Sequence, residues 1–255
     1  MRYYFCLCSF LIPVILASCK NDSVITGPQS GNVSGYIQLY DADGNSASSS
    51  VGVKVAVSGS DKTAQTDDSG KWVISDLSAG VYTFIFTKDG FGMTKIIAYQ
   101  FVGSGTAYVS GLQMTRPSRD ILNFQDFSVT LNADSTRSYN IIAAMPPPYT
   151  EIRSVLLCIG TDSAALANDP SSASLVSALP KAGSGYDGNF NISGVDIIDR
   201  TKNLLWKGTK LYATLAVAGE GRNCQLLSNY FDPSINKQVY TAISPHSQIL
   251  SAVMP

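Results

Sequence analysis

The sequence predicts an all-β protein that consists of two β-sandwich domains in tandem. Glutamate, a strong helix former, occurs only twice in 255 residues, whereas glycine, serine, aspartate, asparagine, threonine and tyrosine are frequent. From Val33 onward, short stretches of alternating apolar and polar residues are separated by turn-forming clusters at intervals of roughly 8 to 12 residues, a spacing typical of sandwiches. The polar, proline-broken residues 115–119 divide these strands into two groups and predict a short linker.

The low charge of the chain excludes several classes of protein. Charged residues make up 15% of the sequence, against roughly 25% in typical soluble domains, and the formal net charge is −1. A nucleic-acid-binding protein presents a basic surface and a coiled coil presents charged faces, so neither class fits. The 45% of hydrophobic residues suffices for ordinary cores, which excludes a disordered chain.

The first 18 residues have the organisation of a secretory signal peptide. Arg2 supplies a positive charge, and residues 3–17 form an apolar run that ends in small residues before Cys19. A transmembrane helix needs about 20 apolar residues, so this shorter, proline-containing run fits a transmembrane anchor less well. Residues 16–19, Leu-Ala-Ser-Cys, resemble the lipobox of bacterial lipoproteins. The alternative is a conventional signal peptide followed by an unmodified cysteine.

The lipobox resemblance implies a membrane partner and a location. Residues 1–18 would be removed, and acyl chains on Cys19 would anchor the mature protein in the bacterial cell envelope, at the outer membrane, without a spanning helix. Two or more acyl chains give a stable anchor where one does not. Residues 19–32 are polar and contain glycine and proline breakers, which predicts a flexible tether that spans roughly 20 Å.

The first domain, residues 33–114, shows clear strand patterns. Ile37 and Leu39 alternate with Tyr36 and Gln38, and the valines at positions 53, 55 and 57 alternate with Lys54 and Ala56. Residues 81–86 are mostly apolar on both faces, which predicts a central strand. The expected core comprises Trp72, Ile74, Leu77, Tyr82 and Phe84. Turns with unusual φ are expected at Gly44, Gly70, Gly80 and Gly90.

Five turn segments of this domain carry a family resemblance. In chain order they read DADGN, GV, TDDSGKW, LSAGVY and KDGF, and they lie at residues 41–45, 52–53, 66–72, 77–82 and 88–91. Their order and spacing resemble the carboxypeptidase regulatory-like domain, which implies a transthyretin-like β-sandwich over residues 33–114. In metallocarboxypeptidases the zinc chemistry lies in a separate domain, and nothing in this sequence resembles it.

The second domain, residues 119–255, is predicted to be an immunoglobulin-like β-sandwich from the spacing of its strands. The expected strands cover residues 127–131, 139–144, 153–159, 210–218, 239–243 and 248–253, and the last two are expected to close the sheet. Residues 211–217 resemble the strand of fibronectin type III domains that carries a core tyrosine. Residues 163–168 and 171–179 are predicted to form short helices or one long loop.

Two short motifs look like ligand sites but lack the necessary context. Residues 183–188 match Gly-x-Gly-x-x-Gly, yet a proline-ended loop precedes them and a strand-like stretch follows, whereas a dinucleotide site needs a strand and then a helix. Asp41, Asp43 and Asn45 have the first ligand spacings of a calcium loop. The glycine and glutamate that complete such a loop are absent, so we expect a hairpin turn there and no metal.

No residue set points to catalysis or to a cofactor. The single histidine, His246, lies beside a proline near the C-terminus, with no nucleophile motif elsewhere in the sequence. Once Cys19 is assigned to lipid, Cys158 and Cys224 remain in the mature chain. The sequence is compatible with a disulfide between them, which suits an oxidising compartment, and equally with two thiols.

Four tyrosines of the first domain, Tyr36, Tyr40, Tyr99 and Tyr108, are candidates for a sugar-stacking platform, and the alternative is ordinary packing. Residues 22–24, 134–136 and 162–164 resemble the O-glycosylation sites of Bacteroidetes envelope proteins. The sequence therefore predicts a non-enzymatic, lipid-anchored envelope protein that acts as a binding, adhesion or spacer module toward a glycan or protein ligand. The alternative function is an accessory glycan-binding lipoprotein of an outer-membrane uptake system.

Overall fold

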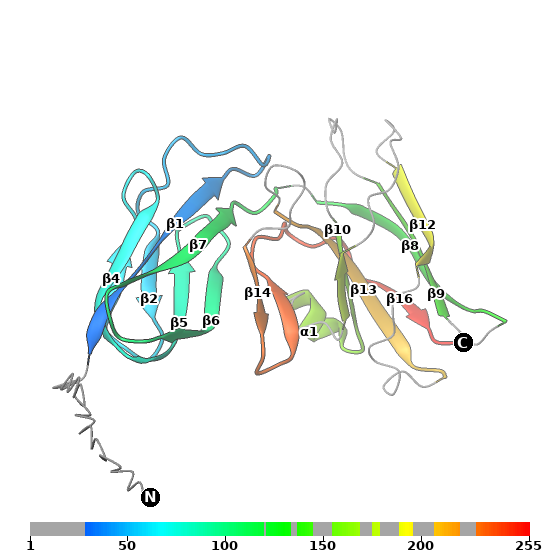
Figure 1. The fold of residues 1–255 in the computed structure, drawn as a ribbon. Helices are drawn as coiled ribbons and strands as arrows, with labels where there is room; N and C mark the ends of the chain where they lie inside the picture. Colours follow the sequence, from blue (N-terminus) through cyan, green and yellow to red (C-terminus); the bar gives the residue numbers. More distant parts are fainter. Residues whose placement is uncertain are drawn as a thin grey trace, which may run out of the picture.

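The computed structural model describes residues 29–119, 121–133, 137–144, 155–168, 175–178, 189–195, 207–219 and 228–255. Strands dominate these residues and one short helix accompanies them, which confirms the predicted all-β class. Two β-sandwiches lie side by side, and a β-hairpin of the second lies next to the first (Figure 1). No helix in the described part of the chain is long and apolar enough to cross a membrane.

The first sandwich packs a three-stranded sheet against a four-stranded sheet. The strand orders are β4-β1-β7 and β3-β2-β5-β6. β1 pairs antiparallel with β4 and parallel with β7, while β5 lies between β2 and β6 as the apolar pattern of residues 81–86 predicts. The strands are β1 (Ser30–Tyr40), β2 (Lys54–Val57), β3 (Thr63–Gln65), β4 (Lys71–Ser78), β5 (Gly80–Thr87), β6 (Thr94–Phe101) and β7 (Thr106–Thr115).

Alternate side chains of each strand fill the core of this sandwich. The Trp72 ring lies with its centroid 5.7 Å from that of Phe84 and 5.4 Å from that of Phe86. Of the five core residues expected from the sequence, four are buried, and Tyr82 packs half-buried against the same cluster. The period-2 pattern is therefore sufficient to identify this core.

Aspartate side chains close the turn that follows β1. Asp41 Oδ1 accepts hydrogen bonds from the backbone N–H groups of Asp43 at 2.9 Å and of Asn45 at 2.8 Å. The carboxylate therefore holds its own turn, as the hairpin interpretation of this segment expects. Three of the four turn glycines have the expected positive φ, namely Gly44, Gly70 and Gly90. The expectation for Gly80 is wrong, because this residue begins β5 in ordinary backbone conformation.

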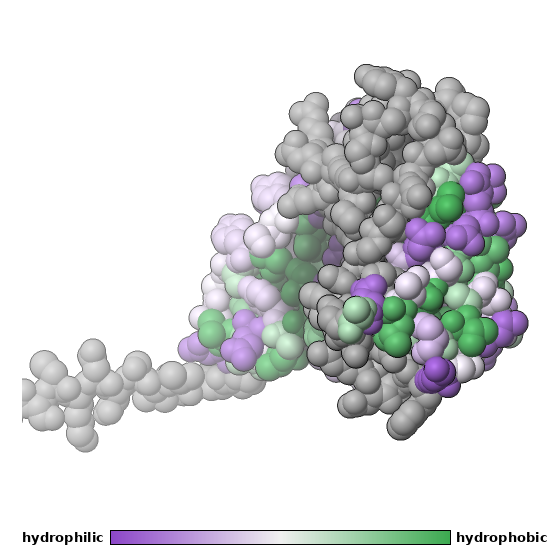
Figure 2. Space-filling model, turned by 90° about the vertical axis from the view of Figure 1, so that its right-hand side faces the viewer, coloured by the Kyte–Doolittle hydropathy of each residue, from purple (hydrophilic) through white to green (hydrophobic). Residues whose placement is uncertain are grey.

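The second sandwich has the strand orders β11-β10-β13-β16 and β12-β9-β8. Its core includes Phe127 and Tyr139, whose rings stack with centroids 6.4 Å apart. Seen from the end of the molecule, its described surface mixes hydrophilic and hydrophobic residues (Figure 2). The strands are β8 (Asn123–Leu131), β9 (Arg137–Ala144), β10 (Val155–Gly160), β11 (Leu175–Ala178), β12 (Asn189–Val195), β13 (Lys210–Val217) and β16 (Leu250–Val253).

β10 is buried along its whole length because both of its faces are covered. One face contributes to the core between the two sheets. The other face packs Leu156 and Cys158 against Leu166 of the helix α1 (Ser163–Asn168). The helix expected at residues 163–168 is thus confirmed. Within residues 171–179 both the helix and the long-loop expectations are wrong, because residues 175–178 form β11, which extends the sheet by pairing with β10.

Residues 239–243 do not add the expected strand to the sheet, although Ile243 forms an isolated antiparallel bridge with Ala218 beside the end of β13. Instead, β15 (Lys237–Tyr240) pairs with β14 (Asn229–Asp232) as a separate hairpin. Its turn is held by Asp232, whose Oδ1 accepts hydrogen bonds from the Ser234 backbone N–H at 3.0 Å and from the Ser234 hydroxyl at 2.6 Å. β16, in contrast, pairs with β13 as predicted.

This hairpin forms a junction with the first sandwich. The Thr94 hydroxyl of β6 donates a hydrogen bond to the Asn229 carbonyl at 3.1 Å, and the Lys95 ammonium lies 4.5 Å from the centroid of the Tyr230 ring. Figure 1 shows β14 beside β6. The hairpin therefore connects the two sandwiches by direct contact, in addition to the chain itself.

The predicted linker, residues 115–119, belongs to the same junction. Thr115 and Ser118 are buried, and the Thr115 backbone N–H donates a hydrogen bond to the Ser228 hydroxyl oxygen at 2.9 Å. Arg116 lies over the Phe91 ring, 4.8 Å from its centroid. The segment is therefore only partly solvated: Thr115 and Ser118 are buried at the junction, while Arg116 and Arg119 are exposed.

Candidate functional site

The outward face of the β4-β1-β7 sheet carries the candidate site. Because side chains alternate along a strand, the neighbours of the inward core residues point away from the sandwich. We call these outward residues the tyrosine face. They are Ser34, Tyr36 and Gln38 of β1, Lys71, Val73 and Ser75 of β4, and Tyr108 and Gln113 of β7.

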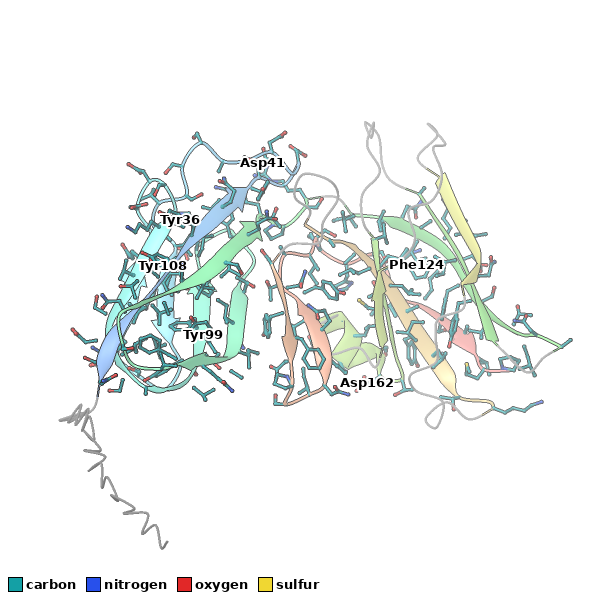
Figure 3. All side chains as sticks on the ribbon, in the orientation of Figure 1. Tyr36, Asp41, Tyr99, Tyr108, Phe124 and Asp162 are labelled. Carbon is teal, nitrogen blue, oxygen red and sulfur yellow. The ribbon has the colours of Figure 1, made fainter. Side chains whose placement is uncertain are left out.

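Two aromatic rings dominate the tyrosine face. Tyr36 is 50% exposed and Tyr108 is 73% exposed, both high values for large rings. Ser34 pairs with Tyr108 on β7, and Tyr36 follows two residues along β1, so strand geometry places the Cα atoms of the two tyrosines about 8 Å apart. Figure 3 shows both on the same sheet. Exposed neighbouring rings of this kind offer a flat apolar surface with polar edges.

The other two tyrosines of the expected platform do not belong to it. Tyr40 is buried, because the chain after β1 folds back to form a bridge between Tyr40 and Ser46. Tyr99 lies on the opposite sheet and packs against Phe84, with ring centroids 5.7 Å apart (Figure 3). A β-bulge near Ala98, whose φ is 57°, accompanies this inward position.

Ser34 lies next to both Tyr36 and Tyr108 and is the residue that sequence analysis missed. Its Cα is paired with that of Tyr108 on one side and that of Val73 on the other. The side chain is 1% exposed, and its hydroxyl oxygen has no hydrogen-bond partner among the described residues. A buried hydroxyl without a partner is uncommon in folded proteins. The alternation of β1 could have placed Ser34 on this face, but not its burial.

The tyrosine face is nearly uncharged. Lys71, which pairs with Tyr36 across β4 and β1, is its one charged member. Hydrogen bonds from the Ser69 hydroxyl and the Lys71 backbone N–H hold the pKa of the Asp67 carboxyl below its usual value, and the Lys71 charge lowers that pKa further. The ionised Asp67 therefore offsets part of the Lys71 charge, and a ligand here would meet little net charge.

The histidine and the aspartates considered in the sequence are occupied by structural contacts. His246 Nδ1 lies 2.8 Å from the Ser247 carbonyl oxygen, and Nε2 lies 3.0 Å from the Ala167 carbonyl oxygen of α1. Both ring nitrogens therefore face backbone acceptors. Within the described ranges no group of three or more histidine, cysteine, aspartate or glutamate residues is placed to hold a metal ion.

Several expected sites lie outside the described residues. These are the lipobox cysteine Cys19, residues 20–28 of the tether, residues 183–188 and Cys224. The tether expectation is wrong for residues 30–32, because they form the start of β1 and pair with β4 and β7. Cys158 is buried in β10, but its pairing with Cys224 stays a prediction. β12 does follow residues 183–188 as a strand, in agreement with the argument against a dinucleotide site.

Taken together, the described residues define a two-sandwich β protein with an exposed, nearly uncharged tyrosine face. No protein family profile and no curated protein matches the sequence. Among solved structures, the chain is similar to a protein from Bacteroides uniformis for which carbohydrate binding has been proposed, with 12% identity and a TM-score of 0.28 over 88% of this chain and 99% of that chain.

Two further solved structures are similar to this chain. A DUF3823 family protein from Bacteroides ovatus has 13% identity and a TM-score of 0.29, over 89% of this chain and 100% of that chain. A chain of a cohesin–X-dockerin complex from Acetivibrio cellulolyticus has 26% identity and a TM-score of 0.30, over 34% of this chain and 59% of that chain. At TM-scores this low, similarity establishes no shared function, so the residues of the tyrosine face must carry the functional conclusion.

Proposed function

We propose that this chain is a non-enzymatic glycan-binding protein of the bacterial cell envelope, anchored by lipid on Cys19. The observation that carries the proposal is the pair of exposed tyrosines, Tyr36 and Tyr108, on one open sheet face. The proposed role is that of an accessory glycan-binding lipoprotein that works beside an uptake system. The two exposed tyrosines favour this role over that of a general adhesion module.

The chemistry of the tyrosine face suits an uncharged polysaccharide. Sugar rings have an apolar C–H face that packs against an aromatic ring, and hydroxyl groups at their edges that form hydrogen bonds. The tyrosine face supplies rings at Tyr36 and Tyr108, and hydroxyl and amide side chains around them. Because its charge is small, we expect the binding to depend little on salt concentration.

Alanine variants of the two tyrosines test the proposal. In gels that contain starch, xyloglucan, yeast mannan or β-1,3-glucan, one polysaccharide should retard the wild-type protein. Tyr36→Ala and Tyr108→Ala should each weaken this binding about tenfold, since exposed tyrosines at a binding surface contribute more than about 1 kcal/mol each.

Phe231→Ala is the matched control for the tyrosine variants. Phe231 is an aromatic residue with 51% exposure on the hairpin, away from the tyrosine face. The control should bind as the wild type does. Equal loss of binding in all three variants, or no retardation by any of the polysaccharides, would refute a glycan site at the tyrosine face.

The lipid anchor predicts a second result. Wild-type protein should fractionate with membranes, and Cys19→Ala should not, because the acylated side chain is removed. Protease treatment of intact cells should degrade the anchored protein if the sandwiches face the exterior, where polysaccharides are encountered. A Cys19→Ala variant that stays in the membrane fraction after a high-salt wash would contradict lipid anchoring.

A rigid spacer is the second candidate function, and the junction between the sandwiches favours it. Hydrogen bonds from Thr94 and Thr115 reach the hairpin region of the second sandwich, so the two sandwiches do not depend on a flexible connection. A spacer needs no ligand, and therefore predicts no retardation in the polysaccharide gels.

A further inference from the structure

We infer that Ser34 is a ligand-contacting residue of the tyrosine face, whose hydroxyl binds a sugar hydroxyl once the neighbouring side chains change rotamer. The inference rests on the proposed function, because it assigns a specific polar contact within the same site. It also commits to the occupant, an uncharged polysaccharide, for which a neutral hydroxyl beside two aromatic rings is a suitable partner.

The position of Ser34 supports this role. β1 is the central strand of its sheet, and Ser34 lies on the outward side of it, opposite the core residue Val33. Tyr108 is its neighbour across β7, and Tyr36 lies two residues further along β1. A ligand that stacks on both rings would therefore lie next to Ser34.

The missing hydrogen bond distinguishes Ser34 from the other buried serine of this sheet region. Ser50 is also buried, and its hydroxyl oxygen accepts a hydrogen bond from the Leu39 backbone N–H at 3.1 Å. Among the described residues, the only other buried side-chain atom without a partner is Nε1 of Trp72, which lies in the core. Ser34 is therefore the one such group on an open face, and it has an unused donor and acceptor.

The cross-strand neighbours of Ser34 are Val73 and Tyr108, and both side chains are exposed. Tyr108 is 73% exposed, so few contacts hold its ring in place. Exposed side chains change rotamer within picoseconds to nanoseconds, which is fast relative to binding. The hydroxyl is thus closed to solvent in the free protein, and we expect a change of rotamer in these neighbouring side chains to open it to a ligand.

Ser34→Ala separates this role from a structural one. The variant should unfold at the same or a slightly higher urea concentration than the wild type, because it removes a buried group that has no partner. Its affinity for the retarding polysaccharide should nevertheless fall about tenfold, as expected when one hydrogen bond to the ligand is lost. Ser50→Ala, the matched buried serine, should unfold at a clearly lower urea concentration and keep the wild-type affinity.

The possible outcomes separate a failure of the inference about Ser34 from a failure of the proposed function. If Tyr36→Ala loses binding and Ser34→Ala binds as the wild type does, the inference about Ser34 is wrong and the glycan site stands. If Ser34→Ala loses stability together with affinity, the serine has a structural role and the inference is also wrong. If no polysaccharide retards the wild type, the proposed function and the inference both fail.

Discussion

Replacement of Trp72 by alanine is expected to lower the free energy of unfolding of the first sandwich by about 3–5 kcal/mol. Trp72 is among the largest fully buried side chains, and its ring packs against both Phe84 and Phe86 between the two sheets. Alanine would leave a large cavity, because a β-sandwich core cannot collapse around a missing indole. Urea denaturation followed by far-ultraviolet circular dichroism measures the change.

A neighbouring residue on the same strand provides the control for this prediction. Val73 follows Trp72 on β4 but points outward, and it is 40% exposed. Val73→Ala should therefore change the free energy of unfolding by no more than about 0.5 kcal/mol. Similar destabilisation by the two variants would mean that the inward and outward faces of β4 are assigned incorrectly.

Local patterns predicted the parts of the fold that depend on local chemistry. The alternation of apolar and polar residues predicts that Trp72 and Phe84 lie in the core. Aspartate and glycine predict the positions of the turns, because an aspartate carboxylate can accept hydrogen bonds from the backbone amides two and four residues after it. The parallel pairing of β1 with β7 was not predicted. That pairing depends on the order of strands across the whole sheet, which no short segment of sequence encodes.

The candidate site was predicted in part for the same reason. Tyr36 points outward because side chains alternate along β1 and its neighbour Ile37 points into the core. Tyr40 has the same alternation but is covered by a later segment of the chain, and the register shift near Ala98 alters the alternation before Tyr99. The burial of Ser34 depends on residues of β4 and β7, so it could not be read from β1 alone.

The junction shows a property of the linker that its composition does not predict. Polar residues between two groups of strands normally indicate a solvated linker. Here Thr115 is fully buried, and its backbone groups bind Ser228 and Gly92 rather than water. The polar character of such a segment can thus reflect a hydrogen-bonded contact between domains, provided that the partner residues are far away in the sequence.

The second large effect is expected at this junction, for Gly92→Val. A Cβ at Gly92 would lie 2.6 Å from the Cβ atoms of both Ala242 and Ser228, which is closer than real Cβ contacts allow. These atoms are attached directly to the backbone and cannot rotate away. Since β-branched valine adds further atoms, the two sandwiches must move apart, and we expect a destabilisation of about 1–3 kcal/mol from overpacking.

Separation of the sandwiches has consequences beyond stability. It should break the hydrogen bond from the Thr115 backbone N–H to Ser228 and expose Thr115 and Ser118, the residues of segment 115–119 that are buried at the junction. We therefore expect faster proteolytic cleavage in this segment, a larger radius of gyration by small-angle X-ray scattering, and two unfolding transitions where the wild type has one. Gly111→Val is the matched control, because no atom lies within 4 Å of a Cβ at Gly111.

The same variant also distinguishes the two candidate functions. The tyrosine face belongs entirely to the first sandwich, so Gly92→Val should keep the affinity for the retarding polysaccharide even though the junction opens. A spacer, in contrast, depends on the fixed distance between the sandwiches and would lose its role. If Gly92→Val unfolds in a single transition with unchanged scattering, the junction is not the rigid contact that its packing indicates, and the spacer hypothesis loses its structural basis.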